Sequence, residues 1–116
     1  MLAALRHHLL GPVNHESVSR DGHWSKVRKD WLLEHAFCAV CATRKFLTVH
    51  HKVPVSWDRT LELILSNLIT LCETPSHNCH LLFGHLGDWK SRNVNVVEDC
   101  EKWAKKIENR PYRIAA

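Results

Sequence analysis

The chain has 116 residues, with 16 Lys and Arg against 12 Asp and Glu, which gives a net charge of +4 with neutral histidines. This length supports a single domain, and a hydrophobic content of 45% excludes an intrinsically disordered protein. Its apolar stretches are too short to span a bilayer, so we expect no membrane partner. Five cysteines and ten histidines are the unusual feature. An odd number of cysteines fits a reducing, cytoplasmic compartment, where clustered Cys and His bind metal more often than they form disulfides.

An arm and a helix are expected before the cysteine-rich part of the chain. Gly11 and Pro12 break the N-terminal stretch and polar residues follow, so we expect residues 1–23 to form an arm in front of one domain at 24–116. Apolar residues within 24–35 recur with i, i+3, i+7 and i+8 spacing. This period predicts an amphipathic helix.

Two short strands are expected in the middle of the chain. Residues 45–50 are rich in β-forming side chains and predict a strand, which Pro54 closes. A long loop follows over 52–66, and residues 68–71 predict a second strand. The central order is therefore helix, strand, loop, strand, helix.

Two helices are expected after the second strand. Residues 79–86 are a candidate helix, with Asn78 as its N-cap and Gly87 as its C-terminal stop. A last helix is predicted over 96–109, with Asn95 as its N-cap. The apolar stripe of this last helix should pack on the domain.

The cysteines have the spacing of a zinc site. Cys38 and Cys41 form a Cys-x-x-Cys knuckle that can hold one zinc ion, and Cys72 and Cys79 can supply the second pair of thiolates. The second pair is separated by six residues, wider than the usual two to four, so His77 remains an alternative to Cys79. A reduced core or a metal-free redox pair are the other interpretations. We expect a structural zinc because a modest core gains much stability from a metal.

Cys100 lies outside this pattern. It falls on the apolar stripe of the last helix. We therefore expect it to be a small buried hydrophobic residue and not a ligand or a nucleophile.

A pair of adjacent histidines, His50 and His51, ends the first predicted strand. Neighbouring side chains on a strand point to opposite faces, so both can serve one site only where the strand ends or bends. A neutral imidazole can bind a divalent metal, and one with a pKa near 6.5 can take a proton from water.

The order of these parts is more specific than any one of them. The set Cys38-x-x-Cys41, His50-His51, Asn67-Leu68, Leu71-Cys72 and Cys79-His80 resembles the HNH endonuclease family. The resemblance runs from about Trp24 to Trp89, and its ending is similar to a subgroup common in phages and bacteria. It implies an α+β fold, in which a ββα-metal core at about 36–90 is flanked by N- and C-terminal helices.

The resemblance also implies roles for individual residues. His50 would be a ligand of a catalytic divalent ion, His51 the general base that activates water, and Asn67 the residue that holds the base and the loop between the strands. His80 would complete the metal site. His85 lies five residues after His80 instead of four, so it could be a ligand, a phosphate contact or a packing residue.

The metal and the substrate follow from the same resemblance. No acidic residue stands at the first position of the histidine pair, so the active ion, which could be Mg²⁺, Mn²⁺, Ni²⁺ or Zn²⁺, would depend on imidazoles. Residues 24–60 hold seven basic and three acidic residues, which favours a polyanionic partner. The candidate phosphate contacts are Arg28, Arg44, Lys45, Lys52, Lys90 and Arg92.

The tryptophans divide into two groups. Trp24, Trp31 and Trp103 lie on helical apolar stripes, and we expect them to be core residues. Trp57 lies in the predicted loop, so it is the candidate for contact with substrate.

The predicted activity is metal-dependent endonucleolytic hydrolysis of DNA. The alternative is a zinc-stabilised DNA-binding module without catalysis. A phage terminase or another DNA-processing protein is a candidate partner, and the chain could act as a monomer or a dimer.

Overall fold

The computed structural model describes residues 19–109 of the chain. Two antiparallel strands and their flanking helices make an α+β fold, which confirms the predicted class. The expected N-terminal arm falls largely on residues 1–18 and so lies outside the described residues. In chain order the elements are α2 (Trp24–Glu34), β1 (Leu47–His51), η2 (Arg59–Leu61), η3 (Leu65–Asn67), β2 (Leu68–Cys72), η4 (His80–Gly84) and α3 (Val96–Glu108).

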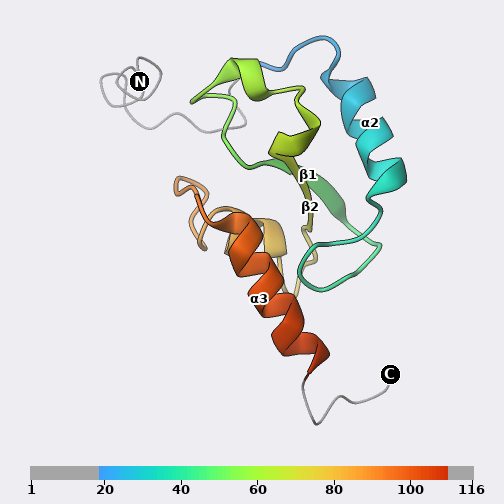
Figure 1. Ribbon diagram of the computed structural model, residues 1–116, viewed down its shortest axis with the longest axis vertical. Coiled ribbons are helices and arrows are strands. Elements are labelled where there is room, and N and C mark those ends of the chain that lie inside the picture. Colours follow the sequence, from blue (N-terminus) through green and yellow to red (C-terminus); the bar gives the residue numbers. More distant parts are fainter. Residues whose placement is uncertain (1–18, 110–116) are drawn as a thin grey trace.

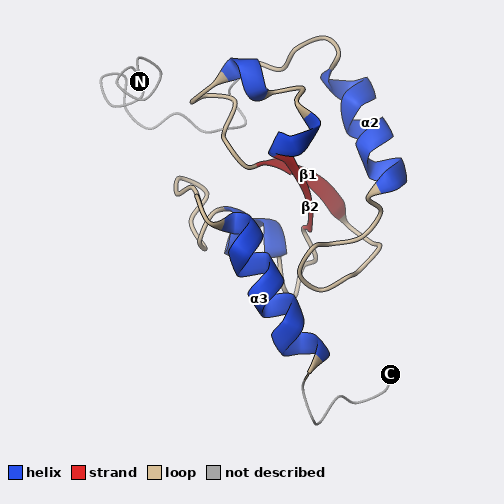
Figure 2. Cartoon of the chain, in the orientation of Figure 1, coloured by secondary structure: helices blue, strands red, loops and turns tan. Residues whose placement is uncertain are grey.

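The strand pair lies at the centre of the molecule, and α2 and α3 lie toward its opposite ends (Figure 1). β1 pairs with β2 in a register that sets His50 opposite Ile69 and His51 opposite Leu68. The loop between the strands carries the short helices η2 and η3 (Figure 2). Both histidines are buried at the end of β1, where the chain turns into this loop.

The hydrophobic core is small and unusually rich in cysteine. Four of its seven fully buried members are cysteines. The cluster consists of Cys38, Val40, Leu71, Cys72, Cys79, Val96 and Cys100. Because so few large apolar side chains are buried here, the core has limited capacity to hold the strands and helices together by itself.

The segment after β2 forms a single turn of π-helix, η4, in the place where the sequence predicts a helix. Asn78 caps it as predicted, since its Oδ1 accepts a hydrogen bond from the backbone N–H of Leu81 at 2.9 Å. Gly87 ends the turn with a φ of +81°, and its N–H donates to the carbonyl of Leu81 at 2.8 Å. Glycine adopts this backbone conformation without steric cost.

Helix α3 packs through its first turns. Val96 and Cys100 are buried, so the prediction that Cys100 is a small buried residue agrees with its place in the core. Asn95 occupies the N-cap position as predicted, but its side chain makes no capping hydrogen bond. Its own N–H instead donates to Oδ1 of Asn93 at 2.9 Å, which fixes the turn before the helix.

The expectation that three tryptophans are core residues is only partly met. Trp103 is 43% exposed and contacts the ring of Phe83 at the surface. Trp31 is half-buried, and its Nε1 donates to the hydroxyl of Thr70 at 2.9 Å. Helix α2 buries none of its residues fully, because one of its faces borders a cleft. No helix in the described part of the chain has both the length and the apolar character to cross a membrane.

Candidate functional site

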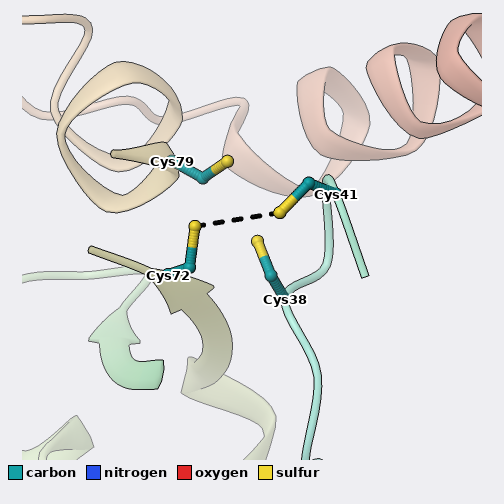
Figure 3. Close-up of side chains that lie close together, drawn as sticks. All are labelled: Cys38, Cys41, Cys72 and Cys79. Carbon is teal, nitrogen blue, oxygen red and sulfur yellow. Dashed lines mark hydrogen bonds between the residues drawn. The ribbon is translucent and has the colours of Figure 1, made fainter. Parts of the chain in front are cut away.

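Four cysteine side chains point toward one another where the Cys38–Cys41 knuckle meets the C-terminal end of β2 (Figure 3). Their sulfur atoms all lie within 4.8 Å of one another, and Sγ of Cys41 and Sγ of Cys72 are 3.8 Å apart. Cys79 lies in this group together with Cys38. The alternative ligand His77 is exposed and contacts the hydroxyl of Ser76 through Nδ1.

The cysteine cluster fits a zinc ion on chemical grounds. A hydrogen bond from Cys79 lowers the pKa of Cys38 to about 4, and the same contact raises the pKa of Cys79. Burial raises the pKa of Cys41 to about 11. Several buried thiolates close together repel one another, whereas a divalent cation stabilises all of them. The backbone N–H of Val40 also donates to Sγ of Cys38 at 3.5 Å, a contact that favours the thiolate.

Three histidines form a second cluster between β1 and η4. Nε2 of His80 lies 3.1 Å from Nδ1 of His50 and 3.2 Å from Nε2 of His85. His50 comes from β1, His80 begins η4, and His85 follows its last residue. The π-helical turn explains how His85 reaches the cluster, since i→i+5 geometry brings residues five apart onto one face.

These three imidazoles have the properties of ligands for a transition metal. Nitrogens that share one ion at about 2.0–2.1 Å with tetrahedral angles lie about 3.3 Å apart, close to the observed separations. Burial, with the neighbouring histidines, lowers the pKa of His50 to about 2, so this ring is neutral. Nδ1 of His85 lies 2.9 Å from the carbonyl of Ser91 and 3.2 Å from Nη1 of Arg92, so Nε2 is the ring nitrogen that faces the cluster.

Two further residues support the histidine cluster. Gly84 packs directly against it, because a Cβ at this position would lie 3.0 Å from Cε1 of His50. Oε1 of Glu73 lies 4.0 Å from Nδ1 of His80, the ring nitrogen that does not face the cluster. The sequence gives no local signal for either role, since both depend on contacts across the fold.

His51 lies beside this cluster with a defined tautomer. Its Nε2–H donates to the main-chain carbonyl of Glu62 at 2.9 Å, which leaves the lone pair on Nδ1. Burial lowers the pKa of His51, and the charge of Arg20 lowers it further, while the hydrogen bond to Glu62 opposes this shift. The ring of Trp24 packs against it with a centroid separation of 4.5 Å.

Asn67 ties the two ends of the loop together. Its Oδ1 accepts from the N–H of Val53 at 2.8 Å, and its Nδ2 donates to the carbonyls of Val53 and Leu61 at 3.1 and 3.2 Å. Leu61 directly precedes Glu62, whose carbonyl holds His51. The position of the loop carbonyl on His51 therefore depends on Asn67.

A cleft of about 230 Å³ reaches the buried histidines. Its wall includes His50, His51, His80 and His85 together with Arg20, Trp24, Arg28, Trp89 and Arg92. The indole of Trp89 packs on His80 and His85, with centroid separations of 5.0 and 4.9 Å. Three arginines against the one carboxylate of Glu73 give the wall of this cleft a positive charge balance.

The predicted phosphate contacts separate into two sets. Arg28 and Arg92 line the cleft, where Nη1 of Arg92 also donates to the carbonyl of Trp89 at 2.7 Å. The other four predicted cations do not line it. These are Arg44, Lys45, Lys52 and Lys90, of which Lys52 is held by a 2.9 Å bond from Nζ to the carbonyl of Ser66.

Arg20, Trp24 and Trp89 line the cleft but were not predicted to do so, and Trp57 was the tryptophan expected to contact substrate. Trp57 is 44% exposed and does not line the cleft, whereas Trp24 and Trp89 do. Arg20 was missed entirely. Arg20 precedes α2, and its place in the cleft depends on contacts with the loop between the strands, so the sequence gives no local signal for it.

The comparisons with known proteins agree with this geometry. Residues 38–83 match the family model described as HNH endonuclease. No curated protein and no solved structure is similar enough to the chain to match. The matched segment begins at the first cysteine of the knuckle and continues through both strands into η4. Over residues 38–83, which form the two-strand core, the chain is therefore similar to the HNH endonuclease family.

Proposed function

We propose that this protein is a metal-dependent endonuclease that hydrolyses phosphodiester bonds in DNA. One observation supports the proposal most directly. His51, with its lone pair on Nδ1, lines the same cleft as the convergent nitrogens of His50, His80 and His85. A base and a metal-binding group side by side are what hydrolysis by an activated water requires.

His51 is the proposed general base. Burial and the charge of Arg20 lower its pKa, so the imidazole is neutral near pH 7 and can accept a proton from water. The carbonyl of Glu62 fixes the ring and its tautomer, and it can stabilise the imidazolium that forms when Nδ1 is protonated. Asn67 is assigned the role of holding the loop that supplies this carbonyl.

The three other histidines are the proposed ligands of the catalytic ion. A bound divalent ion supplies Lewis-acid stabilisation of the phosphate and of the departing oxygen. Neutral imidazoles suit Ni²⁺ or Zn²⁺, while Mg²⁺ and Mn²⁺ would need oxygen ligands from water and phosphate in addition. Cys38, Cys41, Cys72 and Cys79 are assigned to a separate structural zinc.

The cleft arginines are the proposed contacts to the DNA backbone. Arg28 and Arg92 lie on different sides of the histidines in the sequence and line one cleft with them. Guanidinium groups bind phosphate oxygens through paired hydrogen bonds, so they can orient a phosphodiester for attack. The described residues bring these histidines together at one cleft, which predicts nicking by a single copy and double-strand cutting only by two copies or two successive events.

Cleavage of supercoiled plasmid tests the proposal. Purified zinc-loaded protein is incubated with Mg²⁺, Mn²⁺, Ni²⁺ or added Zn²⁺ in turn, as wild type, as His51→Ala and as the control His77→Ala. We expect relaxed or linear product from wild type and the control, and a rate lower by about 10²–10⁴ for His51→Ala. Equal rates in His51→Ala would show that His51 is not the base.

The same assay separates the two classes of function. DNA that is bound but left intact with every metal would contradict the nuclease proposal and favour a zinc-stabilised DNA-binding module. Open circles without linear DNA would indicate a nicking enzyme.

A further inference from the structure

Two contacts fasten the chain on either side of Arg20 to the loop between the strands. Nη2 of Arg59 donates to the carbonyl of Ser19 at 2.6 Å, and the N–H of Asp21 donates to Oε2 of Glu62 at 2.8 Å. These contacts join segments that are about 40 residues apart in the sequence. The backbone of Arg20 is therefore fixed from both directions.

Glu62 is an unexpected residue to find in this place. Its side chain is 2% exposed, and its second carboxylate oxygen lies 3.8 Å from Nη1 of Arg59, which is itself 54% exposed. A buried carboxylate is costly unless it is well paired, so packing alone does not explain its presence. Its side chain holds Asp21, and its main-chain carbonyl holds His51. Glu62 thus connects the segment around Arg20 to the proposed base.

The side chain of Arg20 lines the cleft next to Trp24 and Arg28. An arginine whose backbone is fixed loses less conformational freedom on binding a phosphate than one on a mobile segment. The location and the fixed backbone together suit an anion-binding role.

We propose that Arg20 binds a phosphate of the DNA backbone at the cleft and that Glu62 is the residue that positions it. This inference rests on the proposed function, since it assumes that nucleic acid enters the cleft. It adds a contact from outside the segment that matches the family. Arg20 would act together with Arg28, which lies on α2 one helical turn after Trp24 and on the same face of that helix.

DNA binding without cleavage tests the role of Arg20. A fluorescein-labelled duplex is titrated with zinc-loaded protein by fluorescence anisotropy, without added divalent metal and over a series of salt concentrations. We expect Arg20→Gln to bind about tenfold more weakly and to reduce the slope of log K against log salt by about 1. Arg20→Lys should keep the slope, because it retains the charge.

The control for charge alone is Lys102→Gln. Lys102 is an exposed cation on α3 that does not line the cleft, and its removal changes the net charge by the same amount. We expect its affinity and salt slope to equal those of the wild type. A wild-type slope in Arg20→Gln would overturn the proposal.

The positioning role of Glu62 is tested by variants in two backgrounds. Glu62→Gln keeps an oxygen for the N–H of Asp21 and should retain DNA binding, whereas Glu62→Ala should weaken it about as much as Arg20→Gln. In the Arg20→Gln background, Glu62→Ala should cause no further loss. An equal loss in both backgrounds would show a general structural effect and would contradict positioning.

A surface variant covers the case in which Glu62→Ala fails to fold. Arg59→Ala removes the contact with Ser19 from an exposed side chain, and it should weaken DNA binding only when Arg20 is present. The proposed function is judged separately by plasmid cleavage. If DNA binding depends on Arg20 but the wild type cleaves no plasmid, the nuclease proposal is rejected and this inference is kept. If the wild type cleaves plasmid but Arg20→Gln keeps the wild-type slope of log K against log salt, this inference alone is rejected.

Discussion

His80 and His85 are five residues apart in the sequence, yet their Nε2 atoms lie 3.2 Å apart. An α-helix would place residues i and i+4 on one face and would turn the fifth residue away. The π-helical turn over His80–Gly84 accommodates the extra residue. π-Helical turns are rare and are frequently found at functional sites, which is consistent with a metal-binding role for both histidines.

Replacement of His85 tests this relationship. His85→Ala removes one of three convergent nitrogens and should lower the affinity of zinc-loaded protein for Ni²⁺ by at least about tenfold, as measured by isothermal titration calorimetry. The control is His77→Ala, because His77 is exposed and Nδ1 of its ring contacts the hydroxyl of Ser76, away from the cluster. Equal Ni²⁺ affinity in His85→Ala and wild type would exclude His85 as a ligand.

The difference between these two histidines shows what the sequence could and could not predict. His50, His51 and His80 occupy expected places because strand ends and capped turns have local signals such as Pro54 and Asn78. The position of His85 depended on whether the turn would be an α-helix or a π-helix. That choice is made by packing across the fold and not by local preference.

The cysteine cluster should determine both zinc content and stability. Cys79→Ser removes one of four sulfur atoms and should leave less than one zinc per chain by atomic emission. Its unfolding midpoint should fall by about 10 °C or more, because zinc binding free energy contributes to folding in a domain with a small core.

Cys100→Ala is the matched control for the loss of a buried sulfur. Cys100 is as buried as Cys79 but lies outside the cluster of four. This variant should keep one zinc per chain and lose only the modest stability expected for a small cavity. A full zinc content in Cys79→Ser would show that the cluster does not need this residue.

Replacement of only the Nδ2 amino group of Asn67 by an oxygen should lower the stability of the protein. Asn67→Asp keeps the acceptor for Val53 but replaces the Nδ2 donor with an oxygen that faces two carbonyls. We expect a loss of about 2–3 kcal/mol in the free energy of unfolding, because buried acceptors then lose their donors. Plasmid cleavage should fall as well, since the loop that holds His51 is disturbed.

The control for this change is Asn95→Asp. Asn95 makes no side-chain capping bond, and an added negative charge at the N-terminus of α3 is favourable or neutral. Chemical denaturation should therefore give Asn95→Asp at least the wild-type stability. If both variants were equally stable, the hydrogen bonds of Asn67 would not hold the loop.

The sequence indicated the residues of the two clusters better than the walls of the cleft. A Cys-x-x-Cys knuckle and a His-His pair are local patterns; Cys38, Cys41 and His50 lie in the two clusters, and His51 lines the cleft beside His50. Arg20, Trp24 and Glu62 act through contacts with segments far away in the chain, which no local pattern reports. Trp24 was expected in the core because an apolar helical stripe has the same spacing whether it faces a core or a cleft.

Gly84 gives the sharpest test of the histidine geometry without changing a ligand. A Cβ at this position would lie 3.0 Å from Cε1 and 3.1 Å from Nδ1 of His50, and 3.1 Å from Cδ2 of His80. Gly84→Ala should therefore displace these rings and lower Ni²⁺ affinity by about tenfold. The change in unfolding free energy should stay within about 2 kcal/mol, because the greater helix propensity of alanine offsets part of the strain.

Gly22→Ala is the control, since a Cβ there would meet nothing within 4 Å. If Gly84→Ala bound Ni²⁺ as tightly as Gly22→Ala, the ion would not depend on the observed positions of His50 and His80.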